Sequence, residues 1–258
     1  MPPTPIALIV EDEPTANALL AQLVQLKGYR TDSAFTGGEA LEKIRLHAPD
    51  IVFLDLMLPD IDGYQVCRAV KAAPETSLVP IVLVTAGLVA ENRRQGYRAG
   101  ADDYIPKPYL PQQIFEAMSE VNAWRKSADA PSPIGRFVMD LNDEDNLDRN
   151  LSRLHNLLVA RTPLDLPVID QIVQIPRALF KELKVFSNPL QSRQPATLEY
   201  RVETDRLVLT VQDQTGWIKD GLLDHEDMRN FVTNPQVFDE RIISPAASSI
   251  IFTKRFTP

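Results

Sequence analysis

The run Ile51–Leu54 constrains the fold of this chain more than any other stretch of its sequence. Four consecutive apolar residues are typical of a strand buried on both faces, as in a parallel sheet that helices cover on either side. Asp55 follows this run directly, and Leu58–Gly63 then has the composition of a turn. Because open α/β sheets bind ligands at the carboxyl ends of their strands, Asp55 lies where chemistry is expected.

The first half of the chain alternates apolar strands with helical patterns five times. Short connections between them predict right-handed βαβ units, which assemble into a doubly wound sheet of five parallel strands. The predicted fold class is therefore α/β. The strands are expected at residues 6–10, 29–34, 51–54, 80–84 and 102–105, and the helices at 14–27, 39–46, 62–72, 90–99 and 111–125.

Residues 127–133 are small, polar and rich in proline, which is typical of a linker. They separate a predicted domain at residues 1–126 from a second at 134–258. The second domain is predicted to be α+β, because its helices and strands come in blocks. Pro176 leaves two interpretations open, a kinked helix or a new helix that begins there. We expect strands at 136–141, 197–203, 206–213 and 249–256, and helices at 146–160, 168–184 and 222–233.

Composition narrows the class of protein. The 258-residue chain has no run of ~18 apolar residues, so no membrane span is expected. Its N-terminus lacks the features of a signal peptide, and its single cysteine, Cys67, is typical of a reducing compartment. These features predict a cytoplasmic protein. A net charge of −8 argues against nucleic-acid binding, and the second domain shows no basic stripe, so DNA is an unexpected partner.

Polar residues accompany the ends of four predicted strands in the first domain. Glu11 and Asp12 follow the first strand, Asp55 the third and Thr85 the fourth, while Lys107 lies just beyond the fifth. Carboxylates that converge repel one another, and Mg²⁺ suits a site of a few carboxylates and waters. A carboxylate nucleophile with a metal, a lysine and a hydroxyl is the set that phosphoryl transfer to Asp55 requires.

Four segments resemble the motifs of two-component response-regulator receiver domains: residues 10–13, 54–63, 84–86 and 100–108. The resemblance covers roughly residues 5–125. It implies a flavodoxin-like fold, a sensor histidine kinase as phosphoryl donor and Mg²⁺ as cofactor. It also implies a signalling protein rather than an enzyme, with a homodimer possible through the segments 90–99, 102–105 and 111–125.

The same resemblance implies roles for single residues. Asp55 would be the phosphoacceptor, and Mg²⁺ would be held by Glu11, Asp12, Asp55 and the main-chain carbonyl of Met57. Thr85 and Lys107 would bind the phosphoryl group. Tyr104 would change rotamer when Thr85 moves, although a plain packing role is the alternative. Since neither Met57 nor Gly87 can hold an attacking water by a side-chain hydrogen bond, slow self-dephosphorylation is expected.

The second domain is weakly similar to the GHKL-type ATPase fold of histidine kinases and anti-sigma-factor kinases. Residues 207–213 resemble the strand that leads to the adenine-binding aspartate of that family. The helix around Pro176 lacks the family's glutamate and asparagine, and no glycine-rich lid precedes the last strand, so the nucleotide site is expected to be lost. Asp213 then becomes a turn residue, and His155 a solvated helix residue in preference to a phosphotransfer site.

We therefore expect an output domain that binds a downstream protein without catalysis. A working nucleotide-dependent protein kinase and a DNA-binding regulator are the alternatives. One apolar set could form either the domain core or a partner groove, with the core favoured: Trp217, Leu222, Leu223, Met228, Phe231 and Phe238.

Overall fold

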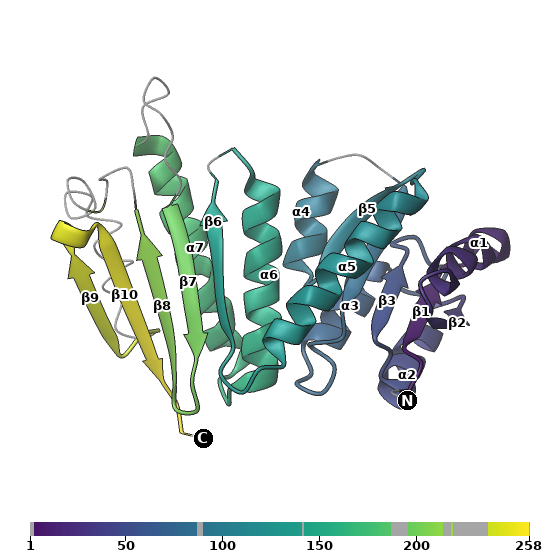
Figure 1. Cartoon of the computed structure of the whole chain (residues 1–258), viewed down its shortest axis with the longest axis horizontal. Coiled ribbons are helices and arrows are strands. Elements are labelled where there is room, and N and C mark those ends of the chain that lie inside the picture. Colours follow the sequence, from purple (N-terminus) through teal and green to yellow (C-terminus); the bar gives the residue numbers. More distant parts are fainter. Residues whose placement is uncertain are drawn as a thin grey trace. The chain divides into compact units, whose positions relative to one another are not determined.

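The computed structural model divides the chain into two compact units, residues 1–126 and 127–258 (Figure 1). It describes residues 3–86, 90–140, 142–186, 196–213, 218 and 237–257. The predicted helix at 222–233 and most of the apolar set around Trp217 lie outside these residues, as does Gly87. Within the described residues, no helix is both long and apolar enough to cross a bilayer.

The first unit is a five-stranded, all-parallel sheet with the strand order β2-β1-β3-β4-β5, which confirms the predicted fold class. Five helices accompany it in the residues that the structure describes. The strands are β1 Ile6–Val10, β2 Arg30–Ala34, β3 Ile51–Leu54, β4 Ile81–Ala86 and β5 Asp103–Lys107, and the helices are α1 Pro14–Gln25, α2 Gly37–His47, α3 Gly63–Lys71, α4 Ala90–Arg98 and α5 Pro111–Ala128.

The central strand β3 is buried along its whole length, as its unbroken apolar run predicts. Val52 and Leu54 join one hydrophobic cluster, which includes Val66 of α3 and Ala40 of α2. The alternate residues of β3 join a second cluster with α1 and α5. Since both faces are covered by apolar side chains, the polar residues that end the strands are pushed to the rim of the sheet.

The ends of two strands at the site, β4 and β5, differ from the sequence prediction, as does the end of helix α5. Strand β4 continues to Ala86 and β5 to Lys107, because Thr85 pairs with Pro106 and Ala86 with Lys107 in the ladder. Thr85 and Lys107 therefore belong to strands instead of following them. Helix α5 runs to Ala128, so the first two residues of the predicted linker are helical.

In its described residues, the second unit is an antiparallel sheet with the strand order β6-β7-β8-β10-β9, together with the long helices α6 and α7, which fits the α+β prediction. Helix α7 runs through Pro176 as one element, so a new helix beginning there is wrong. Strand β9 is not predicted from the sequence, because two of its five residues, Glu240 and Arg241, are charged and no apolar run marks it. The elements are β6 Ile134–Met139, α6 Glu144–Arg161, α7 Leu166–Phe186, β7 Ala196–Val202, β8 Arg206–Gln212, β9 Glu240–Ser244 and β10 Ser249–Arg255.

Candidate functional site

Three charged side chains meet at the carboxyl ends of β1, β3 and β5. The ammonium of Lys107 donates to Oδ2 of Asp55 at 2.5 Å and also to Oε2 of Glu11. Glu11 and Asp55 are only 6% and 7% exposed. The structure thus brings together three of the residues that the sequence analysis selected, although they come from segments far apart in the chain.

Backbone hydrogen bonds fix the two carboxylate-bearing segments against each other. The amide of Asp55 donates to the carbonyl of Val10 at 2.9 Å, and the amide of Glu11 donates to the carbonyl of Ala34 at 3.1 Å. These bonds continue the parallel ladder one residue past the strand ends. The carboxylates therefore project from a rigid rim and not from a loose loop.

Asn17 supports the end of β1 and was missed by the sequence analysis. Its side-chain amide donates to the carbonyls of Ile9 and Glu11, at 3.3 and 3.2 Å, and its oxygen accepts from Ser33 Oγ at 2.6 Å. Asn17 is 2% exposed. A polar residue among the apolar positions of α1 was the signal that could have identified it, because buried amides need hydrogen-bond partners.

The site holds more negative charge than Lys107 neutralises. Burial raises the pKa of Glu11 more than the hydrogen bond from Lys107 lowers it, and the charge of Asp55 raises it further. Burial opposes the charge on Lys107, but its hydrogen bonds to Asp55 and Glu11 prevail and raise its pKa. Two buried carboxylates beside one ammonium leave an excess of negative charge, which attracts a further cation.

The other predicted site residues differ in how far they are exposed to solvent. Glu11, Asp55 and Lys107 are called the triad below. Thr85 is buried, whereas Asp12 is exposed. The Met57 side chain is 73% exposed, but its amide donates to Oδ1 of Asp55 at 3.1 Å. Tyr104 is 7% exposed, and the guanidinium of Arg93 lies 5.8 Å from the centre of its ring. Burial raises the pKa of Tyr104.

The predicted metal donors do not converge on one point in this conformation. Among the described residues, no group of three or more acidic, histidine or cysteine side chains is spaced to hold a metal ion. Glu11 and Asp55 turn toward Lys107 instead. The donor types nevertheless fit Mg²⁺, because both buried groups are carboxylates and the exposed Asp12 adjoins Glu11.

A buried ion pair between Lys71 and Asp102, missed by the sequence analysis, lies at the opposite end of the sheet. The Nζ–Oδ2 distance is 2.6 Å, and Lys71 also donates to the carbonyls of Ser77 and Val79 at 3.0 and 2.7 Å. Asp102 accepts from the amide of Ile81. A lysine on the apolar face of α3 was the available signal.

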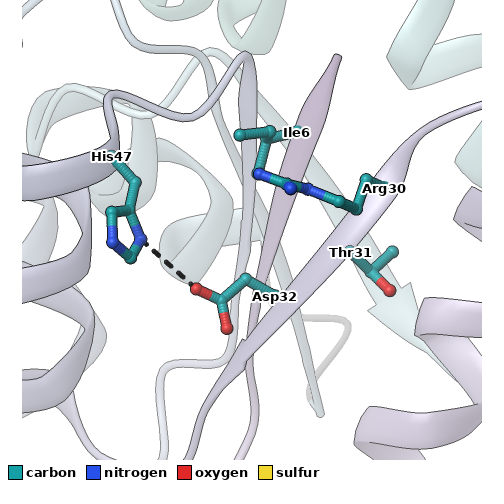
Figure 2. Close-up of a pocket in the computed structure, with 5 residues that line it drawn as sticks. All are labelled: Ile6, Arg30, Thr31, Asp32 and His47. Carbon is teal, nitrogen blue, oxygen red and sulfur yellow. Dashed lines mark ion pairs between the residues drawn. The ribbon is translucent and has the colours of Figure 1, made fainter. Parts of the chain in front are cut away.

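A hollow of about 350 Å³ lies at the amino ends of β1 and β2, away from the triad (Figure 2). Its lining includes an ion-pair contact of 3.5 Å between Nδ1 of His47 and Oδ2 of Asp32. Because open α/β sheets bind ligands at the other edge, this hollow is not the candidate site. The remaining lining residues are Ile6, Arg30 and Thr31.

In the second unit, the candidate residues that the structure describes contact other residues of the same unit. Asp213 is 2% exposed, and its Oδ2 accepts from the amide of Ile218 at 3.0 Å. His155 contacts Asp170 of α7 at 3.1 Å. Phe238 is 2% exposed and packs on Phe252 with 4.9 Å between ring centroids, which places it in the core.

Comparisons with known proteins agree with the geometry of the first unit. The family described as the response regulator receiver domain matches residues 7–119. The transcriptional regulatory protein BaeR of Escherichia coli is 29% identical over 215 residues, which cover 80% of each chain. The phosphate regulon transcriptional regulatory protein PhoB of Rhizobium meliloti is 30% identical over 178 residues, or 68% of this chain and 76% of that one.

One solved structure, a response regulator from Chloroflexus aurantiacus, is similar to part of this chain. It is 35% identical, with a TM-score of 0.46, and the match covers 47% of this chain and 99% of that chain.

Proposed function

Because this chain belongs to the response regulator family and its residues 7–119 form the receiver domain, we propose that Asp55 accepts a phosphoryl group from a sensor histidine kinase. The observation that carries the proposal is the contact of Lys107 with both Asp55 and Glu11. It places a cation beside a buried carboxylate nucleophile, where charge develops during phosphoryl transfer.

The proposed step is a displacement at phosphorus. An oxygen of Asp55 forms a bond to phosphorus while the bond from phosphorus to the imidazole nitrogen of the donor breaks, and that nitrogen keeps the electron pair. Lys107 and the hydroxyl of Thr85 then bind phosphoryl oxygens. The amide of Met57 holds Oδ1 of Asp55 and so orients the attacking carboxylate.

Mg²⁺ completes this site in the proposal. Glu11, Asp12, Asp55 and the main-chain carbonyl of Met57 would hold it, and it would neutralise charge on the transferring group. The placement of Glu11 supports this assignment. Burial, and then the charge of Asp55, raise the pKa of Glu11, and a cation beside both carboxylates would relieve their repulsion.

Switching follows from the new contacts that the phosphoryl group makes. Thr85 and Lys107 gain partners that exist only in the phosphorylated state, so that state favours one conformer. Tyr104 would change its ring position as Thr85 moves. The second unit would transmit the change by binding a downstream protein, without catalysis of its own.

Labelling with acetyl phosphate and Mg²⁺ tests the acceptor. We expect wild-type protein to take up label and Asp55→Asn to take up none. Asp50→Asn is the matched control, because Asp50 precedes the same strand β3 at its other end, where its carboxylate accepts from the amide of Ile6 at 2.8 Å. Label on Asp55→Asn at the wild-type level would contradict the proposal.

DNA binding is the second candidate for the output. Both relatives described above are named as transcriptional regulators, and their alignments are longer than the receiver match. Residues 126–258 contain 16 Lys and Arg against 19 Asp and Glu, which opposes non-specific DNA contact. Salt-dependent binding of the full chain to duplex DNA, stronger with beryllofluoride than without it, would favour this candidate over a protein partner.

A degenerate GHKL-like fold remains the proposal for the second unit. The order of α6, α7, β7 and β8 along the chain supports this fold. The hydrogen bond that the Asp213 carboxylate accepts from the amide of Ile218 supports loss of the nucleotide site. Titration of the full chain with ATP and Mg²⁺ tests this. Absence of binding is expected, and micromolar affinity would favour the alternative of an active kinase.

A further inference from the structure

Asp60 joins the loop after the acceptor to the start of α2. Its Oδ1 accepts from the amide of Gly37 at 2.8 Å and its Oδ2 from the amide of Gly38 at 2.8 Å. The first backbone amides of a helix have no hydrogen-bond acceptor within the helix. In α2, the amide of Glu39 donates to Oγ1 of Thr36 at 3.1 Å. Asp60 therefore completes the cap of α2 from a separate segment. The hydrogen bonds from Gly38 and Gly37 hold its pKa below the ordinary value.

The two glycines allow the loop to approach the helix closely. A Cβ atom on Gly37 would lie 2.4 Å from Cγ1 of Ile61, and one on Gly38 would lie 3.2 Å from Oδ2 of Asp60. The first distance is shorter than a side chain tolerates. Residues 37 and 38 are thus shaped to receive the segment Asp60–Ile61.

This contact connects the two sides of the acceptor site. The helix α2 follows β2, whose last carbonyl, at Ala34, holds the amide of Glu11. The loop 56–62 begins at the residue after Asp55 and carries Met57, whose amide holds Oδ1 of Asp55. Since the Met57 side chain is mostly exposed, packing of that side chain contributes little to fixing its backbone.

We propose that Asp60 is a positioning residue for phosphoryl acceptance. By clamping the loop 56–62 to the amino terminus of α2, it fixes the main chain of Met57 relative to Asp55. Loss of the clamp lets this main chain shift, so fewer molecules hold the acceptor in the productive geometry. The inference rests on the proposed function, because it concerns the rate at which Asp55 takes up phosphate.

The main test is the variant Asp60→Asn in the full chain. Its amide group cannot accept from both glycine amides, so one hydrogen bond is lost. At saturating Mg²⁺ and well below the unfolding temperature, we expect the maximal labelling rate with acetyl phosphate to fall about 5- to 30-fold, with little change in the half-saturating acetyl phosphate concentration. The matched control is Asp143→Asn, which removes the aspartate that caps α6 through the amide of Asn146 at 2.9 Å.

A second variant attacks the same contact from the helix. Gly37→Ala pushes on Ile61, so it should slow labelling as well, and the double variant with Asp60→Asn should be little slower than the slower single variant. Wild-type labelling rates in both single variants, with only a lower unfolding temperature, would reduce Asp60 to a helix cap and overturn the inference. In that case Asp55→Asn still fails to label, whereas label on Asp55→Asn overturns the proposed function itself.

Discussion

Lys107 lies 2.5 Å from Oδ2 of Asp55, so the proposed acceptor is already paired with a positive charge before any phosphoryl group arrives. The same ammonium also contacts Glu11. A cation that enters between the two carboxylates must therefore share them with Lys107. If Mg²⁺ binds here as proposed, it and the ammonium would both neutralise the two carboxylates, and each would weaken the need for the other.

Replacement of Lys107 should make the protein depend more on Mg²⁺. In Lys107→Met the carboxylates of Glu11 and Asp55 lose their cation, and without Mg²⁺ we expect the free energy of unfolding to fall by about 1–3 kcal/mol, since the pair is partly exposed. Thermal unfolding with and without Mg²⁺ measures this. Mg²⁺ should raise the midpoint more in Lys107→Met than in wild type or in the control Lys43→Met, and equal shifts would contradict the prediction.

The residue two positions past the acceptor should set the lifetime of the phosphorylated state. Met57 projects a largely exposed thioether, which cannot orient an attacking water by hydrogen bonding. We expect Met57→Asn to lose label about 3- to 10-fold faster than wild type after removal of acetyl phosphate, because an amide can hold that water. Met57→Leu is the control and should keep the wild-type decay rate.

Much of the first unit could be predicted because its signals are local. The unbroken run Ile51–Leu54 marks a strand covered on both faces, and the polar residues at strand ends mark the rim. The ends of β4 and β5 were misplaced because Pro106 and Lys107 read as a loop, whereas pairing with Thr85 and Ala86 keeps them in the ladder. Pairing between strands far apart in sequence is not visible in a local pattern.

The supporting residues were missed for the same reason. Asn17, Lys71 and Asp60 each have a partner on another segment, at Ser33, Asp102 and Gly37. A polar residue on an apolar helix face indicates burial, but it does not identify the partner. The metal donors follow from the resemblance to receiver domains, which does not reveal that Glu11 and Asp55 both contact Lys107 in this conformation.

Breaking the buried pair of Lys71 and Asp102 should destabilise the receiver domain without touching its chemistry. Both side chains are almost fully buried, so Lys71→Met leaves an uncompensated carboxylate and should cost about 3–5 kcal/mol of unfolding free energy. Urea unfolding followed by circular dichroism measures this cost. The double variant Lys71→Met with Asp102→Leu should recover part of the loss. Failure to recover any would show that the hydrogen bonds of the pair to the backbone of Ser77, Val79 and Ile81 matter more than the charge.

The pair of Asp32 and Lys43 should contribute a pH-dependent part of the stability. Burial opposes ionisation of Asp32, but the hydrogen bonds from Lys43 and from the amide of Ser33, together with the positive charge of Lys43, lower its pKa from the ordinary value. This stabilisation is therefore present above the pKa that Asp32 has in the unfolded chain. It is lost as the pH falls through the lower pKa that Asp32 has in the folded protein. Near neutral pH, the free energy of unfolding of wild type should exceed that of Asp32→Asn by up to about 1 kcal/mol. Urea unfolding at strongly acidic pH should show no difference between the two. A difference that persists there would contradict the assigned cause.

Arg93 should bias the ring position of Tyr104. Its guanidinium lies over the ring at 5.8 Å from the centroid, with the ring nearly buried. A cation over an aromatic face contributes about 0.5–1 kcal/mol at such sites, which corresponds to about a 2- to 5-fold change in an equilibrium between two ring positions. If the ring has a buried position and an exposed one, as the proposed switch requires, the contact favours the buried position, and Arg93→Gln should increase the exposed population. The matched control is Arg94→Gln, because the guanidinium of Arg94 pairs with Glu91 at 3.1 Å instead.

Nuclear magnetic resonance of protein labelled at tyrosine reports these populations directly. The Tyr104 signal should move toward that of an exposed ring in Arg93→Gln and stay at the wild-type position in Arg94→Gln. If Tyr104 couples to Thr85 as proposed, the apparent affinity for beryllofluoride should change in proportion to the population of the ring position that favours binding. A shift of the ring signal with unchanged beryllofluoride affinity would separate the two residues and leave Tyr104 with a packing role, because a ring that takes part in the switch cannot change its populations without changing the free energy of binding.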